Sequence, residues 1–354
     1  MPSSRPRERF APDEAREVIR RIGSDRLGRV EKVVEFDRGS SRSPKLLIST
    51  ETSRWLLKRR APINAAPERV RFCQDFQRRL ELALVPVAAP QPFKSGETSL
   101  RMGDHVYEYF RFVDGARYQR SVDHAQAAGE ALGQLLLAAM TMRLDGDPVH
   151  GSFHASGIIL GAAKLAEESV PAVEPEVDRA ELLGHTKALR QMYRVAAQRG
   201  IESGFAATGV QPIHGDYHPG NLIFSGGEVA AIVDFDAARV EPRAVEVANA
   251  LLHLGSLRLP SHEIDEWPAG LDPLLVRAAM GGVKRAGVTL ELPERRAIPW
   301  LMIEACIAEG IVPIARTGSL ANLQGSAMVR FLRRRAEWIR EEEPLILEAL
   351  SPSS

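Results

Sequence analysis

Residues 213–240, IHGDYHPGNLIFSGGEVAAIVDFDAARV, gather many side chains that bind metals or move protons. The stretch contains two histidines, three aspartates and one asparagine. Carboxylate and amide oxygens suit a hard cation, and a carboxylate beside such a cation can accept a proton from a hydroxyl. The spacing of these residues therefore indicates metal-assisted chemistry on an oxygen nucleophile.

The stretch is predicted to fold as a β-hairpin, because NLIFS and EVAAIVDF are apolar runs separated by Gly226 and Gly227. Glycine accepts the positive φ that a two-residue hairpin turn requires. Antiparallel pairing then brings Asn221, at the start of the first strand, close to Asp234, at the end of the second. Asp216 lies on the loop just before them.

Mg²⁺ is the metal that this arrangement favours. It takes one or two protein oxygens and fills its remaining positions with water and phosphate oxygens, which Asn221 and Asp234 would allow. Asp216 could accept a proton from a hydroxyl that attacks a phosphate. The sequence thus predicts the division of labour that phosphoryl transfer needs.

Two other interpretations of the histidines stay open. Zinc could be bound by three side chains spaced two residues apart, His214, Asp216 and His218. The simpler interpretation is that the histidines brace the loop through hydrogen bonds to the backbone. For His214 we favour this structural role.

The elements around the motif change character along the chain. Alternating apolar and polar residues predict antiparallel strands within 29–60, 97–102 and 105–113, with an amphipathic helix over 68–84. A helix capped by Asp123 should follow. PAVEPEVD, at 171–178, is interpreted as a linker. Further helices are expected near 178–199, 241–256, 272–286, 297–311 and 322–341. The fold class is therefore α+β.

Composition excludes several classes of protein. Among 354 residues there are 46 Lys+Arg and 46 Asp+Glu, so no net charge attracts nucleic acid or an anionic membrane. Cys73 and Cys306 lie in apolar-periodic segments and are expected to be reduced core residues. No signal peptide and no membrane-spanning run is predicted, so we expect a cytoplasmic protein.

HGDYHPGN at 214–221, followed by IVDFD at 232–236, resembles the signature of the aminoglycoside phosphotransferase and choline kinase family. The resemblance implies a protein-kinase-like fold with a small β-rich N-lobe, residues 1–113, and a larger helical C-lobe, residues 114–354. It also implies ATP and Mg²⁺ as cofactors. In this family Asp216 would be the catalytic base, with His214 supporting its loop. Asn221 and Asp234 would bind the metal, and Asp236 would assist.

The resemblance also implies residues that bind the nucleotide. Lys58, in RWLLKRRAP, would hold phosphates, with Arg59 and Arg60 as competitors for the role. The following helix should offer a partner to this lysine, and the candidates are Glu68, Gln74 and Asp75.

Two further segments would complete the nucleotide site. The loop DRGSSRSP, at 37–44, lacks GxGxxG, but Ser40, Ser41 and Arg42 could still bind phosphate. The strand that joins the lobes would bind adenine through its edge, with Glu108 and Phe110 as the contacts.

Two segments of the C-lobe leave structural questions open. RAVEVANALLHL places Glu246 where the family commonly has an Asp-Leu-Ala helix start, which alters a structural contact. The helix with Met328, Phe331, Leu332 and Trp338 is expected to pack on the core rather than on a partner.

The predicted function is transfer of the γ-phosphate of ATP to a hydroxyl of a small metabolite or sugar. A bacterial Ser/Thr protein kinase and a nucleotide-binding pseudokinase are the alternatives. An aminoglycoside acceptor would need a dense acidic lining, and the candidate acids, which are also consistent with solvated helix faces, are Glu263, Asp265, Glu266 and Glu304.

Overall fold

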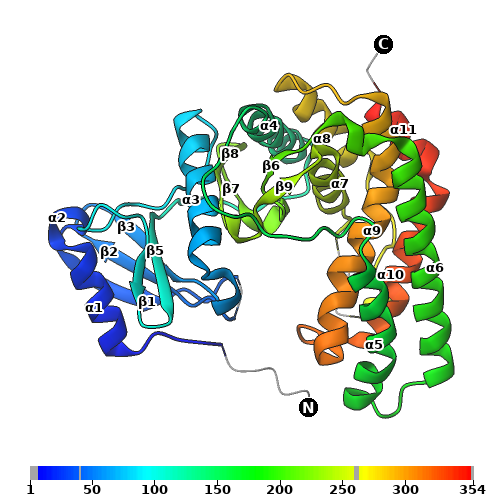
Figure 1. The fold of residues 1–354 in the computed structure, drawn as a ribbon, viewed down its shortest axis with the longest axis horizontal. Coiled ribbons are helices and arrows are strands. Elements are labelled where there is room, and N and C mark those ends of the chain that lie inside the picture. The colour runs from blue at the N-terminus through cyan, green and yellow to red at the C-terminus, as the bar shows by residue number, and fades with distance from the viewer. Residues whose placement is uncertain (1–6, 40, 259–262, 352–354) are drawn as a thin grey trace.

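The chain folds into two lobes, a smaller sheet-containing one and a larger helical one (Figure 1). The computed structural model describes residues 7–39, 41–258 and 263–351. This confirms the predicted α+β, two-lobed fold class.

The smaller lobe is built on a five-stranded antiparallel sheet in the order β1-β2-β3-β5-β4. Its strands are β1 (Val30–Glu35), β2 (Lys45–Thr50), β3 (Arg54–Arg59), β4 (Leu100–Met102) and β5 (His105–Arg111).

The register of this sheet aligns three ionisable residues in one row. Lys45 lies opposite Lys58, and Lys58 lies opposite Glu108. Directly opposed residues of an antiparallel pair share a face, so the three side chains point the same way. This face is turned toward the other lobe.

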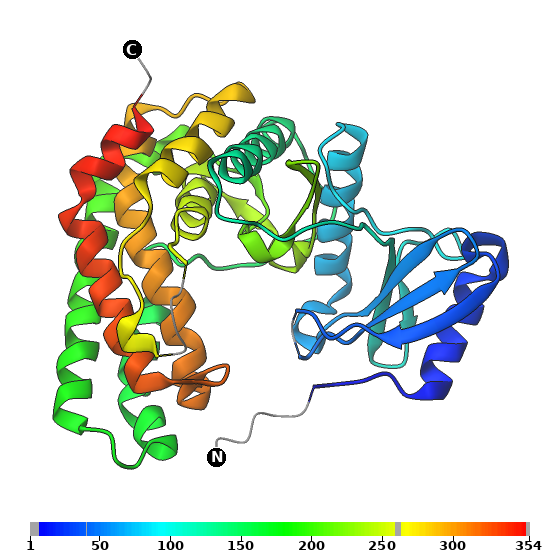
Figure 2. The ribbon, with the colours of Figure 1, turned by 180° about the vertical axis from the view of Figure 1, so that it is seen from behind.

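The opposite face of the sheet is covered by α1 (Pro12–Ile22), which the sequence analysis did not predict. Val18 and Ile22 of this helix are fully buried and pack in one cluster with Leu57 and Tyr107 of the sheet. Figure 2 shows the helix on the outer side of the lobe. A short helix, α2 (Ser24–Leu27), follows it.

Helix α3 (Pro67–Leu82) belongs to the N-lobe and packs against the C-lobe. Phe76 and Cys73 of α3 belong to the large hydrophobic core of the C-lobe, and the ring of Phe76 meets that of Phe235 edge-on at 5.6 Å. The site between the lobes is therefore backed by a helix fixed to both.

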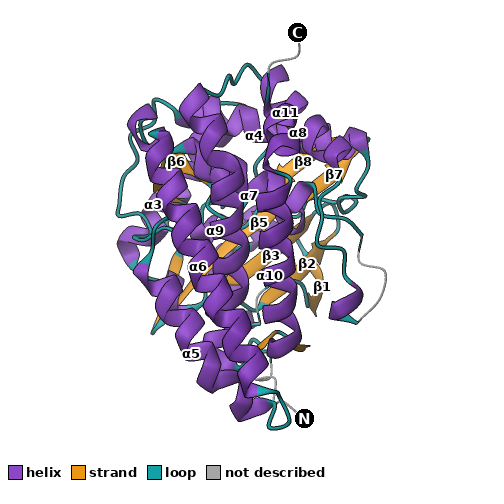
Figure 3. Ribbon diagram, turned by 90° about the vertical axis from the view of Figure 1, so that its right-hand side faces the viewer, coloured by secondary structure: helices purple, strands orange, loops and turns teal. Residues whose placement is uncertain are grey.

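The larger lobe is mainly helical, and Figure 3 shows its long helices in a layer in front of the strands. The helices are α4 (Val122–Ala139), α5 (Gly157–Val173), α6 (Arg179–Ser203), α7 (Arg243–Leu254), α8 (Pro273–Arg285), α9 (Leu292–Thr317), α10 (Gly325–Glu341) and α11 (Glu343–Leu350). A two-residue ladder, β10 (Ser319–Leu320) with β11 (Leu323–Gln324), precedes α10.

Helix α9 forms the centre of this layer. It is long and apolar enough to cross a membrane by length and composition, although the sequence analysis expected no run of that kind. However, 78% of its most apolar window is buried within the fold, against α5, α6, α7 and α10. We therefore interpret α9 as a core helix of the C-lobe.

One helix begins at another residue than predicted, and one helix was not predicted. The N-cap of α4 is Ser121, whose side chain accepts from the backbone N–H of His124, and Asp123 lies inside the first turn. Helix α5 runs through Pro171 to Val173, into the segment predicted as a linker. Proline has no N–H to donate to the carbonyl four residues before it, but here the loss falls in the last turn, so little of the helix depends on it.

Other expectations are confirmed by burial. Cys73 and Cys306 are free and buried. In α10, Met328, Phe331 and Leu332 are buried in the C-lobe core, so this helix packs on its own chain.

Candidate active site

Two small antiparallel ladders in the C-lobe carry the site. Strands β7 (Leu222–Ser225) and β8 (Glu228–Ile232) form the predicted hairpin, with Gly226 at φ 59° and Gly227 at φ 90° in the turn. Strands β6 (Gln211–Ile213) and β9 (Arg239–Glu241) form the second ladder. The loop 214–221 and the segment 233–238 lie between them.

The hairpin register places Asn221 beside the segment that holds Asp234. Leu222 pairs with Ile232, and the carbonyl of Asn221 accepts a hydrogen bond of 3.0 Å from the N–H of Val233. Asp234 itself has a φ of 67°, a conformation that few non-glycine residues adopt. Strained backbone of this kind is common at functional sites, where it directs a side chain.

His214 is completely buried and braces the loop, in line with the structural interpretation favoured for it. Its Nδ1 accepts from the N–H of Asp216 at 3.2 Å, so the proton is assigned to Nε2, which lies 3.0 Å from the carbonyl of Val233. Burial lowers the pKa of His214, so its ring is neutral.

These contacts overturn the zinc interpretation, because both ring nitrogens of His214 are used by the backbone. In the part of the chain that the structure describes, no three His, Cys, Asp or Glu side chains are grouped to hold a metal ion.

The carboxylate of Asp216 is oriented by two neighbours. Asn221 donates to its Oδ2 at 3.0 Å, and Nε2 of His218 lies 3.4 Å from the same oxygen. Burial alone would raise the pKa of Asp216, but His218 and the nearby histidines lower it below its usual value. The group is therefore ionised and can accept a proton.

The turn before Asp216 is held from both sides. Glu246, at the start of α7, accepts from the N–H of Gly215 at 2.8 Å, and Arg239 donates to the carbonyl of Gly215 at 2.9 Å. A Cβ at Gly215, whose φ is 78°, would lie 2.2 Å from the carbonyl oxygen of Ala237.

Glu246, where the family commonly has an aspartate, thus reaches the loop of Asp216 directly. Complete burial raises its pKa to about 7.

Lys58 pairs with aspartates of the other lobe. Its Nζ lies 2.9 Å from Oδ1 of Asp234 and 2.9 Å from Oδ1 of Asp236. Burial opposes the charge, but the two carboxylates raise the pKa of Lys58 above its usual value. The expectation that α3 supplies the partner is wrong, since Glu68 pairs with Arg71 on the surface and Asp75 with Arg78 and Arg79.

The two arginines that competed with Lys58 are used elsewhere. Arg59 points to the outer face, where it pairs with Glu8 and Glu14. Arg60 is 1% exposed and lies 2.8 Å from Glu108 and 2.8 Å from Asp236. Lys58 is the member of the three that lines the cleft.

These ion pairs engage two residues of the predicted site. Glu108 accepts from Arg60 and from Gln74 of α3, at 2.8 and 2.6 Å, so its side chain links helix to sheet. The Oδ1 of Asp236 binds Lys58 and Arg60, and its Oδ2 accepts from Asn64 at 3.2 Å, so its assisting role at the metal stays a prediction.

The backbone groups that are free to bind adenine also differ from those predicted. The backbone of Glu108 and Phe110 pairs with β3, and Gln91 binds the carbonyl of Tyr109 at 2.8 Å from the other side. The side chain of Phe110 still lines the cleft, whose wall continues through residues 111–117. Backbone groups of 113–115 are thus the better candidates for an edge contact.

Of the three loop residues predicted to bind phosphate, the two that the structure describes do not line the cleft. Ser40 lies outside the described residues, while Ser41 and Arg42 are exposed and are not part of the cleft wall. Arg38, Gly39 and Lys45 line the cleft instead.

Lys45 is a residue that the sequence analysis missed. It is 8% exposed, and its Nζ lies 3.4 and 3.5 Å from the backbone carbonyls of Arg38 and Ser43. Burial and the charge of Lys58 lower the pKa of Lys45. Its position opposite Lys58 could have been found only from the strand register.

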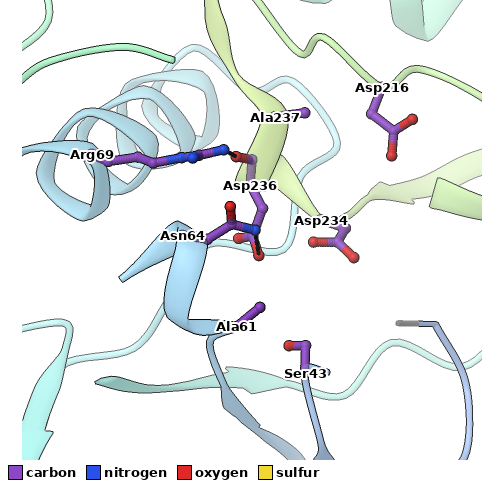
Figure 4. Close-up of a pocket in the computed structure, with 8 residues that line it drawn as sticks. All are labelled: Ser43, Ala61, Asn64, Arg69, Asp216, Asp234, Asp236 and Ala237. Carbon is purple, nitrogen blue, oxygen red and sulfur yellow. Dashed lines mark hydrogen bonds between the residues drawn. The ribbon is translucent and has the colours of Figure 1, made fainter. Parts of the chain in front are cut away.

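The cleft between the lobes has a volume of ≈ 740 Å³, within the range of sites for small molecules and cofactors. A second cavity of ≈ 220 Å³ lies on the other side of the aspartates. Figure 4 shows Asp234 and Asp236 next to Asn64 there, with Asp216 farther along the wall and Arg69 reaching the backbone of Asp236.

The oxygens near the hairpin fit a divalent cation. Oδ2 of Asp234 and Oδ1 of Asn221 have no hydrogen-bond partner among the described residues, while their other polar atoms are engaged. Two protein oxygens without a hydrogen-bond partner match the sparse protein ligation of Mg²⁺.

Comparison with known proteins agrees with this geometry. The model of the phosphotransferase enzyme family (APH) matches residues 32–281. A search of curated proteins finds no match.

Solved structures resemble the chain in fold, at low sequence identity. An aminoglycoside phosphotransferase from Alicyclobacillus acidocaldarius is similar with a TM-score of 0.64 and 15% identity, over 99% of this chain and 98% of that one. A microcompartment-associated aminopropanol kinase gives 0.64 and 14%, over 90% and 94%. The amicoumacin kinase hAmiN, in complex with AMP-PNP and Ca²⁺, gives 0.62 and 14%, over 86% and 87%.

Proposed function

The chain belongs to the phosphotransferase enzyme family, and from this premise we propose that it transfers the γ-phosphoryl group of ATP to a hydroxyl of a small molecule. The observation that carries the proposal is the position of Asp216. Its ionised carboxylate lies at the junction of a nucleotide-sized cleft and a smaller cavity, next to free oxygens of Asp234 and Asn221.

Asn221 and Asp234 would hold the metal of this reaction. Mg²⁺, when bound, neutralises the charge of the phosphates and holds them in place. The structure of amicoumacin kinase with AMP-PNP and Ca²⁺ supports nucleotide and divalent-cation use in this fold. Lys58 and Lys45 would bind phosphate oxygens from the N-lobe side.

Asp216 is proposed to act as the base. It would take the proton of the acceptor hydroxyl as the hydroxyl oxygen forms a bond to the γ-phosphorus. The bond from that phosphorus to the ADP oxygen breaks, and ADP leaves with the electron pair. His218 and Asn221 hold the carboxylate, and His214 holds its backbone.

A small acceptor is favoured over a protein. After Asp236 the chain passes through β9 and enters α7 at Arg243, so it forms no long segment on which a peptide could lie. The acids considered for an aminoglycoside do not form a dense lining, since Glu304 is buried against His154 and Asp265 pairs with Arg330 on the surface. The similar structures include kinases of amicoumacin and aminopropanol, which supports a small acceptor without naming it.

The proposal is tested by ADP release from ATP and Mg²⁺ in the presence of pooled hydroxyl metabolites, amino alcohols, sugars and aminoglycosides. Replacing Asp216 with Asn keeps shape and hydrogen bonding but removes the base, so we expect kcat to fall by a factor of about 10² or more. AMP-PNP binding should change little, because the loss concerns the transition state. Equal turnover in the variant, or no stimulation by any pool, would contradict the proposal.

A further inference from the structure

The segment Arg7–Ala11 lies outside the part of the chain that the family model matches, residues 32–281, yet it contacts the loop over the nucleotide cleft. In Figure 2 it runs along the N-lobe before entering α1.

Two residues of this segment hold the loop by its outer edge. The N–H of Glu8 donates to the carbonyl of Ser41 at 2.9 Å, and Nη2 of Arg7 donates to the carbonyl of Gly39 at 3.1 Å. The guanidinium of Arg7 also lies 3.8 Å from Asp37. The inner edge of the same loop, at Arg38 and Gly39, faces the cleft.

The segment is itself anchored on the sheet. Glu8 pairs with Arg59 at 3.0 Å, and the guanidinium of Arg59 lies over the ring of Phe10 at 5.5 Å. Phe10 is 8% exposed and packs near Tyr107. Arg59 directly follows Lys58 on β3, so the strand that turns Lys58 to the cleft fixes the segment on its other face.

We propose that Arg7 and Glu8 are positioning residues for the nucleotide phosphates, acting through the described loop residues 37–39 and 41–44. This inference rests on the proposed function, because it assumes that the cleft binds a nucleotide. A loop must be ordered before its backbone can hold phosphate, and ordering it costs conformational entropy. Contacts that order the loop in the free protein lower the entropy lost on binding. Neither residue lines the cleft.

The test compares Arg7→Ala with Arg9→Ala, since Arg9 is exposed and makes no described contact. Binding of AMP-PNP with Mg²⁺ and of adenosine is measured by calorimetry, and amide hydrogen exchange is followed over residues 36–44. For Arg7→Ala we expect faster exchange in the loop and AMP-PNP binding weakened about five- to tenfold, with adenosine binding unchanged. The KM for ATP should rise more than kcat falls, while Arg9→Ala should match the wild type.

A second variant, Asp37→Ala, removes the partner of Arg7 on the loop and leaves the anchored segment intact. Its effect on AMP-PNP binding should add little to that of Arg7→Ala in the double variant. Unchanged loop exchange in Arg7→Ala, or equal weakening of adenosine and AMP-PNP, would overturn the inference alone. Failure of the wild type to bind AMP-PNP would overturn both the inference and the proposed function.

Discussion

At the scale of single residues, Lys45 is a buried cation. Among the described residues, no carboxylate lies within ion-pair distance of its ammonium group. Replacing it with Met should raise the free energy of unfolding by about 1 kcal/mol, because a buried ammonium without a carboxylate partner is costly. The same change should weaken AMP-PNP binding about tenfold and leave adenosine binding unaltered. Urea denaturation and calorimetry on the wild type and Lys45→Met measure the two effects. A destabilised variant with normal AMP-PNP affinity would show a purely structural lysine.

Glu246 should make stability depend on pH. Its folded pKa of about 7 lies above the ordinary value of 4.5, so the folded state retains a proton that the unfolded chain has lost. Its contribution is fully present below pH 4.5 and is lost as the pH rises toward 7. Glu246→Gln can still accept from Gly215 but cannot ionise.

Denaturation at pH 5 and pH 8 measures this effect. Relative to the wild type, Glu246→Gln should be more stable at pH 8 than at pH 5 by about 2 kcal/mol. The same difference between the two proteins at both pH values would exclude Glu246 as the titrating group.

Residues within one short motif could be predicted, and partners far apart in the sequence could not. The hairpin turn at Gly226 and Gly227 determines which residues meet, so the proximity of Asn221 and the Asp234 segment follows from local spacing. The pairing of Lys58 with Asp234 and Asp236 joins positions more than 170 residues apart. No local pattern indicates such a contact.

At the scale of elements, the crossing of α4 and α8 depends on two glycines. A Cβ at Gly282 would lie 2.0 Å from the carbonyl oxygen of Gln126, and one at Gly129 would lie 1.9 Å from that of Ala279. Backbone atoms cannot move aside as side chains do, so the helices must separate if either residue is enlarged.

Gly282→Ala should therefore lower the free energy of unfolding by about 2 to 3 kcal/mol. Gly281→Ala is the matched control, because a Cβ there meets nothing within 4 Å and alanine favours the helix by roughly 1 kcal/mol. Urea midpoints of the two variants give the comparison, and equal midpoints would mean that the close packing contributes no stability.

Helices were predicted where a long apolar face was present and missed where the pattern was short or unusual. In α5, the buried residues Ile159, Ala163, Ala166 and Val170 follow helical spacing. Near its start, however, the helix has three consecutive apolar residues followed by Gly161, which hide that spacing. In α1, Pro12 at the first position and Glu14 bonded to the N–H of Ala11 are start signals that could have been recognised.

At the scale of the whole molecule, a buried ionic cluster joins the lobes. Asp236 of the C-lobe binds Lys58 and Arg60 of the N-lobe, and both cations are nearly inaccessible to water. Although burial opposes its charge, the cations hold the pKa of Asp236 below its usual value, so its contribution is lost as the pH falls below about 4. The general two-lobed arrangement was predictable from the strand-rich first third, whereas this cluster was not.

Asp236→Asn should cost about 2 kcal/mol or more at pH 7, because Lys58 and Arg60 each lose a buried partner. Asp25→Asn, at an exposed pair with Lys94, should change stability by less than about 0.5 kcal/mol. Urea denaturation at pH 7 and at pH 2 compares them, and the deficit of Asp236→Asn should shrink at pH 2, where the ionised form of Asp236 is being lost. A deficit that does not depend on pH would argue against the ion pair.

The central position of α9 has a consequence during synthesis. A ribosome releases this 26-residue apolar helix before α10 and α11, which cover part of it, have emerged. A nascent chain stopped after Thr317 therefore presents to the translation machinery a segment that resembles a membrane anchor. Helices α10 and α11 thus complete the burial of a core helix that is synthesised before them.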